Sequence, residues 1–170
     1  MPLQAPVLLI VDYNLSRIGD VLHLRDYALQ QWGAQTWLIR ANPQDHDQTI
    51  SDRVIDADPL HPDFVSRVLD HLGEDASRIS AGMVFSDNAV ASGAALLERL
   101  GLPVDDAALA LGAFDKLAYR IAEDRIRPQL HPLGVTLPDF VRIDCLNDVR
   151  NFAVRQEGSF VIKPACEGNN

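Results

Sequence analysis

Lysine is the rarest basic residue in this sequence. Of its 15 basic residues, 13 are arginine and only two, Lys116 and Lys163, are lysine. A lysine ammonium is a compact point charge that can approach one phosphate oxygen, whereas the arginine guanidinium is a wide planar fork. In a chain that otherwise uses arginine, lysine could therefore occur at positions where a side chain has to contact a phosphate group. The alternative is that the two lysines stand where they do by chance.

Composition narrows the class of protein. The 170 residues carry a net charge of -9, and no stretch concentrates the basic residues, so nucleic acid and anionic membranes are not expected partners. The start of the chain lacks the positive region of a signal peptide and no apolar run could span a bilayer, so we expect a cytoplasmic protein. Cys145 and Cys166 fit neither a disulfide framework nor a zinc-ligand spacing and are expected to be free thiols.

Strand and helix patterns alternate over the first hundred residues. The continuous apolar run Val7 to Val11 is typical of a central parallel strand covered on both faces. Glycine ends the two helical patterns that follow. This alternation predicts an α/β fold with a Rossmann-like, doubly wound parallel sheet. The expected strands are 7–11, 35–39, 53–57 and 79–85, and the expected helices are 19–32, 64–72 and 90–100.

The alternation of strand and helix patterns ends at Gly101-Leu102-Pro103. One long helix is predicted over 107–126, then strands over 139–143 and 160–163 with a short helix over 147–155 between them. Two strands and one helix cannot close a core. We therefore expect a first domain over residues 1–112 and a small, incomplete α+β domain over 113–170, truncated so that more polypeptide would follow.

Four short motifs follow one another along the chain, and their order is informative. They are Leu100-Gly101-Leu102-Pro103, Phe114-Asp115-Lys116 with Arg120 one turn later, Leu133-Gly134-Val135-Thr136-Leu137-Pro138, and Phe160-Val161-Ile162-Lys163-Pro164 with a Gly-Asn loop. Together they resemble the entry to an ATP-grasp fold, as in biotin carboxylase or D-alanine:D-alanine ligase. The resemblance implies a pre-ATP-grasp domain followed by the first part of an ATP-grasp domain.

The resemblance also implies roles for individual residues. Lys116 matches a lysine near the nucleotide phosphates, and Lys163 matches one that contacts the adenine and α-phosphate region. Glu167, Gly168 and Asn169 match the start of the glycine-rich lid over the β- and γ-phosphates. The sequence departs from the family here, because one glycine is followed by two asparagines. Asparagine does tolerate the left-handed backbone that such a loop needs.

Enzymes of this family convert a carboxylate into an acyl phosphate with ATP, and a nucleophile then displaces the phosphate. The resemblance thus implies ATP and Mg²⁺ as cofactors and a small-molecule carboxylate and an amine, or a thiol, as substrates. The family's metal ligands lie in the C-terminal half of the ATP-grasp domain. We therefore expect Mg²⁺ ligands downstream, none within this chain, and no ligase activity from these residues alone.

A substrate site is expected where the parallel strands end. Ligands of open α/β sheets bind beyond the carboxyl ends of the strands. The polar residues there are candidates for substrate binding, although each could equally be a cap or turn residue, and Ser86, Asp87 and Asn88 could cap the following helix. These candidates are Asp12, Asn14, Arg40, Asp87 and Asn88.

Three other readings remain. A receiver-like phospho-acceptor signalling domain would explain Asp12, Asp56 and a late Lys-Pro pair, but Tyr13 replaces its second acid. A Rossmann dehydrogenase lacks support because the loop 12–19 contains no G-x-G-x-x-G. The third reading is a non-catalytic substrate-binding or dimerisation domain, since a homodimer is common among N-terminal domains of this kind.

Overall fold

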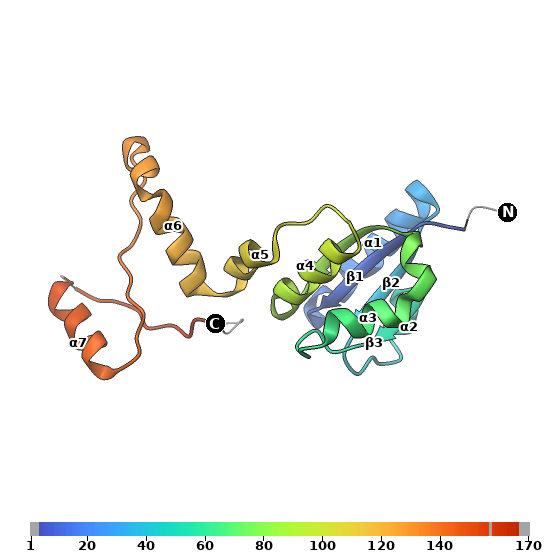
Figure 1. Ribbon diagram of the computed structural model, residues 1–170, viewed down its shortest axis with the longest axis horizontal. Helices are drawn as coiled ribbons and strands as arrows, with labels where there is room; N and C mark the ends of the chain where they lie inside the picture. The colour runs from blue at the N-terminus through green and yellow to red at the C-terminus, as the bar shows by residue number, and fades with distance from the viewer. Residues whose placement is uncertain (1–3, 157, 167–170) are drawn as a thin grey trace. The chain divides into compact units, whose positions relative to one another are not determined.

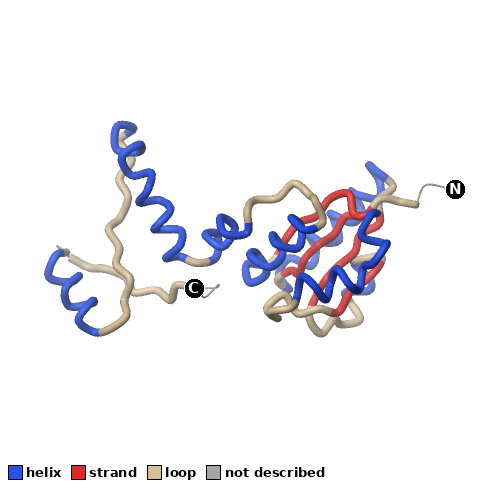
Figure 2. Tube along the Cα trace, viewed as in Figure 1, coloured by secondary structure: helices blue, strands red, loops and turns tan. Residues whose placement is uncertain are grey.

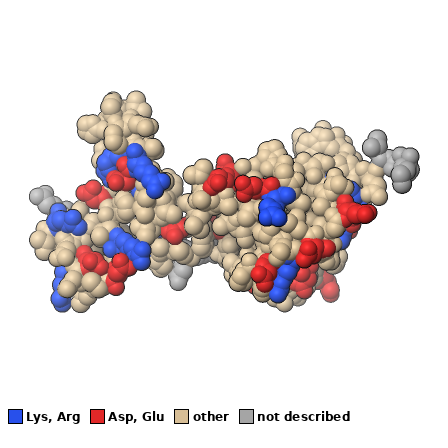
Figure 3. Space-filling view, in the orientation of Figure 1, with Lys and Arg blue, Asp and Glu red and all other residues tan. Residues whose placement is uncertain are grey.

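The computed structural model describes residues 4–156 and 158–166 of the chain. It divides into two compact units, Met1–Leu111 and Gly112–Asn170. Each unit is described by itself below (Figure 1). On the face shown in Figure 3, Lys and Arg side chains are interspersed with Asp and Glu, so the described residues form no continuous basic patch there.

The first unit is built around one parallel sheet of four strands in the order β3-β2-β1-β4. β1 lies at the centre because its apolar run can be covered on both faces, and Leu9, Ile10 and Val11 are fully buried. The strands are β1 (Val7–Tyr13), β2 (Gln35–Arg40), β3 (Arg53–Asp56) and β4 (Ile79–Phe85).

Helices cover both faces of this sheet. α3 (Phe64–Leu72) and α4 (Val90–Arg99) lie in front of it in Figure 1, and α1 (Ile18–Trp32) lies behind. Two clusters of buried side chains match these layers. One joins α3 and α4 to the sheet through Phe64 and Leu97, and the other joins α1 and the short α2 (Asp47–Ile50) through Val21 and Ile50. The predicted α/β doubly wound sheet is thus confirmed.

The strand order also separates the readings of the sequence. The order 3-2-1-4 is that of the first four strands of a Rossmann-like sheet, whereas flavodoxin-like receivers have the order 2-1-3-4-5. The receiver reading is therefore not supported. α1 ends as the sequence predicts, at Gly33, whose left-handed φ of 61° lets its N–H donate to the Leu29 carbonyl at 2.9 Å.

The predicted cap of α4 is wrong. Residues 86–88 do not supply a side-chain cap, because a short 3₁₀ turn, η3 (Asp87–Ala89), intervenes and α4 begins after Ala89. The other 3₁₀ turns are η1 (Leu15–Arg17), η2 (Gly73–Arg78) and η4 (His131–Leu133).

The single helix predicted over 107–126 is also wrong. It is two helices, α5 (Ala107–Phe114) and α6 (Lys116–Leu130), which meet at Asp115. Asp115 has an extended backbone, with φ -81° and ψ 107°, and its carboxylate accepts hydrogen bonds from the amides of Leu117 and Ala118. An aspartate that caps the first turn of a helix ends the preceding one, because it needs a non-helical backbone.

The expected α+β character of the second unit is not found. The described residues from 112 onward contain α6, η4 and α7 (Leu146–Arg155) but no strand, and Figure 2 draws both 139–143 and 160–163 as loop. A strand exists only when its backbone pairs with a neighbour. None of the residues in α5, α6 or α7 is buried, so these helices have no core of their own within the described part.

None of the helices in the described part of the chain is long and apolar enough to cross a membrane.

Candidate functional site

Asp12 lies at the carboxyl end of β1 with an unusual backbone. Its φ of 51° is left-handed, which is uncommon for a residue other than glycine, and the pairing of β1 with β4 shifts register between Val11 and Tyr13. The Asp12 carboxylate forms an ion pair with Arg40 at the end of β2, with 3.5 Å between Oδ1 and Nη1. The structure therefore brings together two of the predicted substrate-binding residues.

Arg40 is held by several groups of this edge. Its Nη1 donates to the Tyr13 carbonyl at 2.8 Å, its Nε lies 3.8 Å from the Asp47 carboxylate, and its guanidinium stacks 4.3 Å from the centre of the Tyr13 ring. Within the described residues its Nη2 makes no hydrogen bond. Arg40 thus links β1, β2 and α2, and one nitrogen remains for a ligand.

Asp47 is the residue of this edge that the sequence does not predict. It is fully buried, and its carboxylate accepts from the Tyr13 hydroxyl at 2.7 Å and from the Gln44 amide at 2.6 Å. Burial, followed by the hydrogen bond to Asp47, raises the pKa of Tyr13 above its usual value. No local pattern marks an aspartate in the polar stretch 42–49 as buried, because its partner Tyr13 is 34 residues away.

The other predicted substrate-binding residues make fewer contacts at this edge of the sheet. Asn14 is half-buried and its carbonyl caps η1 by accepting from Arg17 at 2.7 Å. Asp87 and Asn88 are exposed in η3. β1 and β4 are adjacent and parallel, so their ends share one edge of the sheet. Nevertheless, in the described part of the chain no hydrogen bond or ion pair joins Asp87 or Asn88 to Asp12 or Arg40.

In the second unit, the segments that carry the two lysines meet. The backbone N–H of Lys116 donates to the carbonyl of Ala165 at 2.9 Å, and the Cys166 thiol donates to the Asp115 carboxylate at 3.3 Å. Lys163 is exposed and Lys116 is half-buried. Ala165 lies two positions after Lys163, so the two lysines, 47 positions apart in the sequence, are carried by contacting segments.

The start of α6 offers no free backbone donor to a ligand. The Lys116 amide is taken by Ala165, the Leu117 and Ala118 amides by the Asp115 carboxylate at 2.8 and 3.0 Å, and the Tyr119 amide by the Asp115 carbonyl at 2.9 Å. A helix N-terminus often binds phosphate through such amides. Here these amides are already bonded within the chain and are not available to a phosphate.

Asp115 and Cys166 affect each other's proton affinity. The backbone amide of Ala118, then the Cys166 thiol, lowers the pKa of Asp115 below its usual value. The same contact raises the pKa of the Cys166 thiol. Both cysteines are free thiols, as expected, and Cys166 serves here as a hydrogen-bond donor to the capping carboxylate.

The remaining expectations concern the lid and the metal. Glu167, Gly168 and Asn169 lie outside the described residues. Within residues 4–156 and 158–166, no group of three His, Cys, Asp or Glu side chains could hold a metal ion.

Comparison with known proteins gives similarity in structure only. No family model matches the chain, and no curated protein matches it in sequence. An L-amino acid ligase from Bacillus licheniformis is similar over 97% of this chain and 38% of that chain, with a TM-score of 0.63 and 16% identity. An N5-carboxyaminoimidazole ribonucleotide synthetase from Thermus thermophilus is similar over 88% and 36%, with a TM-score of 0.56 and 19% identity.

The chain thus spans less than two-fifths of either relative's length, 38% and 36%. At these identities the similarity concerns the fold. The predicted resemblance is confirmed at that level: this chain has the fold of the N-terminal portion of ATP-grasp enzymes.

Proposed function

We propose that this chain is the N-terminal part of an ATP-dependent ligase that joins a small-molecule carboxylate to an amine or a thiol through an acyl phosphate. The observation that carries the proposal is the hydrogen bond from the Lys116 amide to the Ala165 carbonyl, since it fixes the Lys116 helix against the segment that carries Lys163. The chain's only two lysines are thereby carried by one local structure.

The residues present fit part of an ATP site. ATP would supply the phosphoryl group that activates the carboxylate. Lys116 and Lys163 would offset the charge of the phosphates with compact ammonium groups, because the amides at the start of α6 are already bonded. Glu167, Gly168 and Asn169 would begin the lid. The chain's own contribution would be to bind and orient the nucleotide.

The carboxyl edge of the first unit's sheet would take a substrate. Arg40 is held by Asp12, the Tyr13 carbonyl and Asp47, and this arrangement leaves Nη2 for a substrate oxygen. Asn14, Asp87 and Asn88 would add polar contacts. Ligands of such sheets bind at this edge. A cytoplasmic location and a homodimer are further parts of the proposal.

Nucleotide titration of the 170-residue chain tests the proposal. We expect weak, saturable binding of ATP, followed by NMR, that is at least about tenfold weaker in Lys116→Ala and in Lys163→Ala, since each removes a charged hydrogen bond. Arg99→Ala is the control, because Arg99 is exposed in the last turn of α4. If neither lysine substitution changes the affinity for ATP, the proposed nucleotide site is refuted. If this chain alone shows robust ligase turnover, the proposal that it is only part of the enzyme is refuted.

Further measurements distinguish the rival functions. Phosphorylation of an aspartate by acetyl phosphate would indicate a receiver, and binding of NAD in place of ATP would indicate a dehydrogenase. A chain that binds no nucleotide and sediments as a dimer would be a dimerisation domain.

A further inference from the structure

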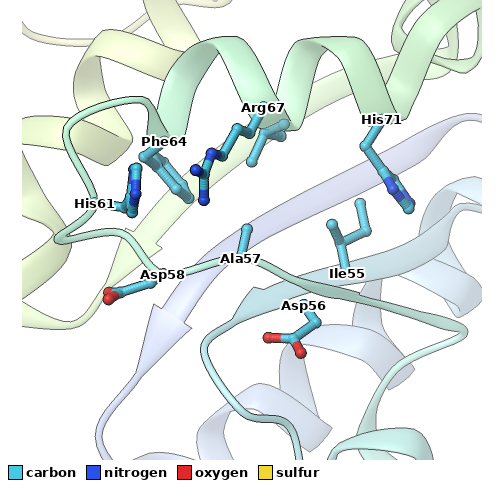
Figure 4. A pocket seen from close by; sticks show the side chains of 9 residues that line it. Ile55, Asp56, Ala57, Asp58, His61, Phe64, Arg67 and His71 are labelled. Carbon is cyan, nitrogen blue, oxygen red and sulfur yellow. The ribbon is translucent and has the colours of Figure 1, made fainter.

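A cavity lies on the α3 side of the first unit, on the opposite face of the sheet from α2 and Asp47. It has a volume of about 280 Å³ and is formed between α3 and the segment that continues β3 (Figure 4). Its base is closed by the buried side chains of Ile55, Phe64 and Val68. The volume is just below the usual range for ligand pockets, so the cavity suits a small molecule.

Arg67 supplies the positive charge of this cavity. On a helix, a basic residue usually pairs with acids three or four positions away, and Asp63 and Asp70 stand at these positions. Within the described residues, however, the Arg67 side chain makes no hydrogen bond or ion pair. Figure 4 shows its guanidinium turned from α3 toward the loop at Ala57. An unpaired guanidinium over a cavity is a donor fork for an anion.

Two histidines add hydrogen-bond donors. The Nδ1 atom of His61 accepts from the backbone N–H of Asp63 at 3.0 Å, so the proton of the neutral ring is on Nε2. The Nε2 atom of His71 lies 3.2 Å from Nη2 of Arg53, which can only donate, so the proton of His71 is on Nδ1. Both rings line the cavity with Arg67 and each retains one N–H. The cavity is therefore rich in donors.

Two carboxylates at the rim limit the charge of the ligand. Asp56 and Asp58 border the cavity, but Figure 4 shows their carboxylates turned away from α3. One oxygen of each accepts from a backbone amide, that of Asn42 at 3.0 Å and that of Leu60 at 2.9 Å. One guanidinium opposite two carboxylates disfavours a dianion such as phosphate more than a monoanion. A planar monoanion also matches the guanidinium fork.

From these contacts we infer that the cavity is a binding site for a small organic monocarboxylate, held by the Arg67 guanidinium with the remaining N–H groups of His61 and His71 as hydrogen-bond donors. The site belongs to the first unit alone and uses neither lysine. It therefore does not rest on the proposed function, and a failure of ATP binding leaves it unaffected.

Titration of the 170-residue chain with sodium propionate at constant ionic strength tests this site. In amide and histidine NMR spectra, we expect saturable shifts at His61, Arg67 and His71. Arg67→Gln should weaken binding at least about tenfold, and Arg67→Lys should weaken it less, since it keeps the charge but loses the fork. Arg99→Gln, which makes the same change of charge at an exposed residue in the last turn of α4, should bind as the unmodified chain does.

Two further probes define the ligand class. Propionamide has the same shape without the charge and should bind at least about tenfold more weakly than propionate. Inorganic phosphate should also bind more weakly because of Asp56 and Asp58. The inference is overturned if propionate gives no saturable shift, if Arg67→Gln binds it unchanged, or if phosphate or propionamide binds as tightly. The spectrum of each variant shows directly whether it is folded.

Discussion

The hydroxyl of Tyr13, at the end of β1, donates a 2.7 Å hydrogen bond to the carboxylate of Asp47, which is fully buried at the start of α2. This bond joins the central strand to the connection between β2 and β3. It also helps to hold Arg40, which contacts both residues. The carboxyl edge of the sheet is therefore held together by a buried polar network, and such networks are costly to break in part.

Tyr13→Phe should destabilise the first unit by about 1–3 kcal/mol, because it leaves a buried carboxylate oxygen without its donor. The ring, and with it the contact to Arg40, is retained. Denaturant unfolding followed by tryptophan fluorescence measures this change, since Trp32 and Trp37 both lie in the first unit. Tyr27→Phe is the matched control and should change stability by less than about 0.5 kcal/mol, since Tyr27 is 55% exposed. Equal effects of the two substitutions would contradict the role of the bond.

The same pair predicts how stability depends on alkaline pH. The pKa of Tyr13 is raised in the folded state above the ordinary value of 10.0. Above pH 10.0 the unfolded chain therefore releases this proton while the folded chain keeps it, so the free energy of unfolding falls as the pH rises. Below pH 10.0 the contribution is fully present. Urea midpoints at neutral and alkaline pH should show this decline, and it should be smaller in Tyr13→Phe. An identical decline in both proteins would rule out Tyr13 as its source.

Gly93 allows α4 to approach the sheet closely. A Cβ atom added at this residue would lie 2.5 Å from a methyl group of Val84 in β4 and 3.3 Å from one of Val11 in β1. Gly93→Ala should therefore destabilise the first unit by about 1–3 kcal/mol through overpacking, despite the better helix propensity of alanine. Gly19→Ala in α1 is the control, because no atom lies within 4 Å of its added Cβ. Thermal unfolding compares the two, and a Gly93→Ala variant as stable as Gly19→Ala would show that the helix can shift without cost.

The sequence predicts the first unit well because its elements are marked locally. The apolar run at Val7 and the glycine at Gly33 mark where a strand and a helix lie, and β4 has the predicted bounds, Ile79–Phe85. Asp47 could not be found in this way. Its burial depends on Tyr13 and Arg40, which reach it only once β1 and β2 are side by side.

The sequence predicts the second unit less well, for two physical reasons. Residues 139–143 and 160–163 have the composition of strands, but a strand also needs a partner, and no pairing supplies one within the described residues. The apolar stripe that predicts one helix over 107–126 continues through Asp115, which hides the break. The sequence did contain a signal for it, since aspartate is a preferred N-cap residue.

Asp115 offers a test of how the Lys116 segment is held. Asp115→Ala removes the acceptor of the Leu117 and Ala118 amides, whereas Asp115→Asn keeps an acceptor oxygen at the same place. We expect the alanine variant to destabilise α6 by about 1 kcal/mol and to speed amide hydrogen exchange at Leu117 and Ala118. The asparagine variant should stay close to the unmodified chain at neutral pH. Fast exchange in both variants would show that the charge, and not the cap, holds the helix start.

Acidic pH distinguishes the effect of the negative charge of Asp115 from the effect of its helix cap. The pKa of Asp115 is lowered below 3.8 in the folded state, so its stabilising contribution is present above pH 3.8 and is lost as the pH falls through the folded value. Amide exchange of Ala118 should therefore show an acid-dependent loss of protection in the unmodified chain and none from this source in Asp115→Asn.

Asp115→Asn also removes a negative charge beside Lys116. The two residues interact, since the charge of Lys116 contributes to the lowered pKa of Asp115. If Lys116 binds phosphate, ATP affinity should be equal or higher in Asp115→Asn and lower in Asp115→Ala. ATP affinity unchanged in both variants would place the nucleotide away from this helix start.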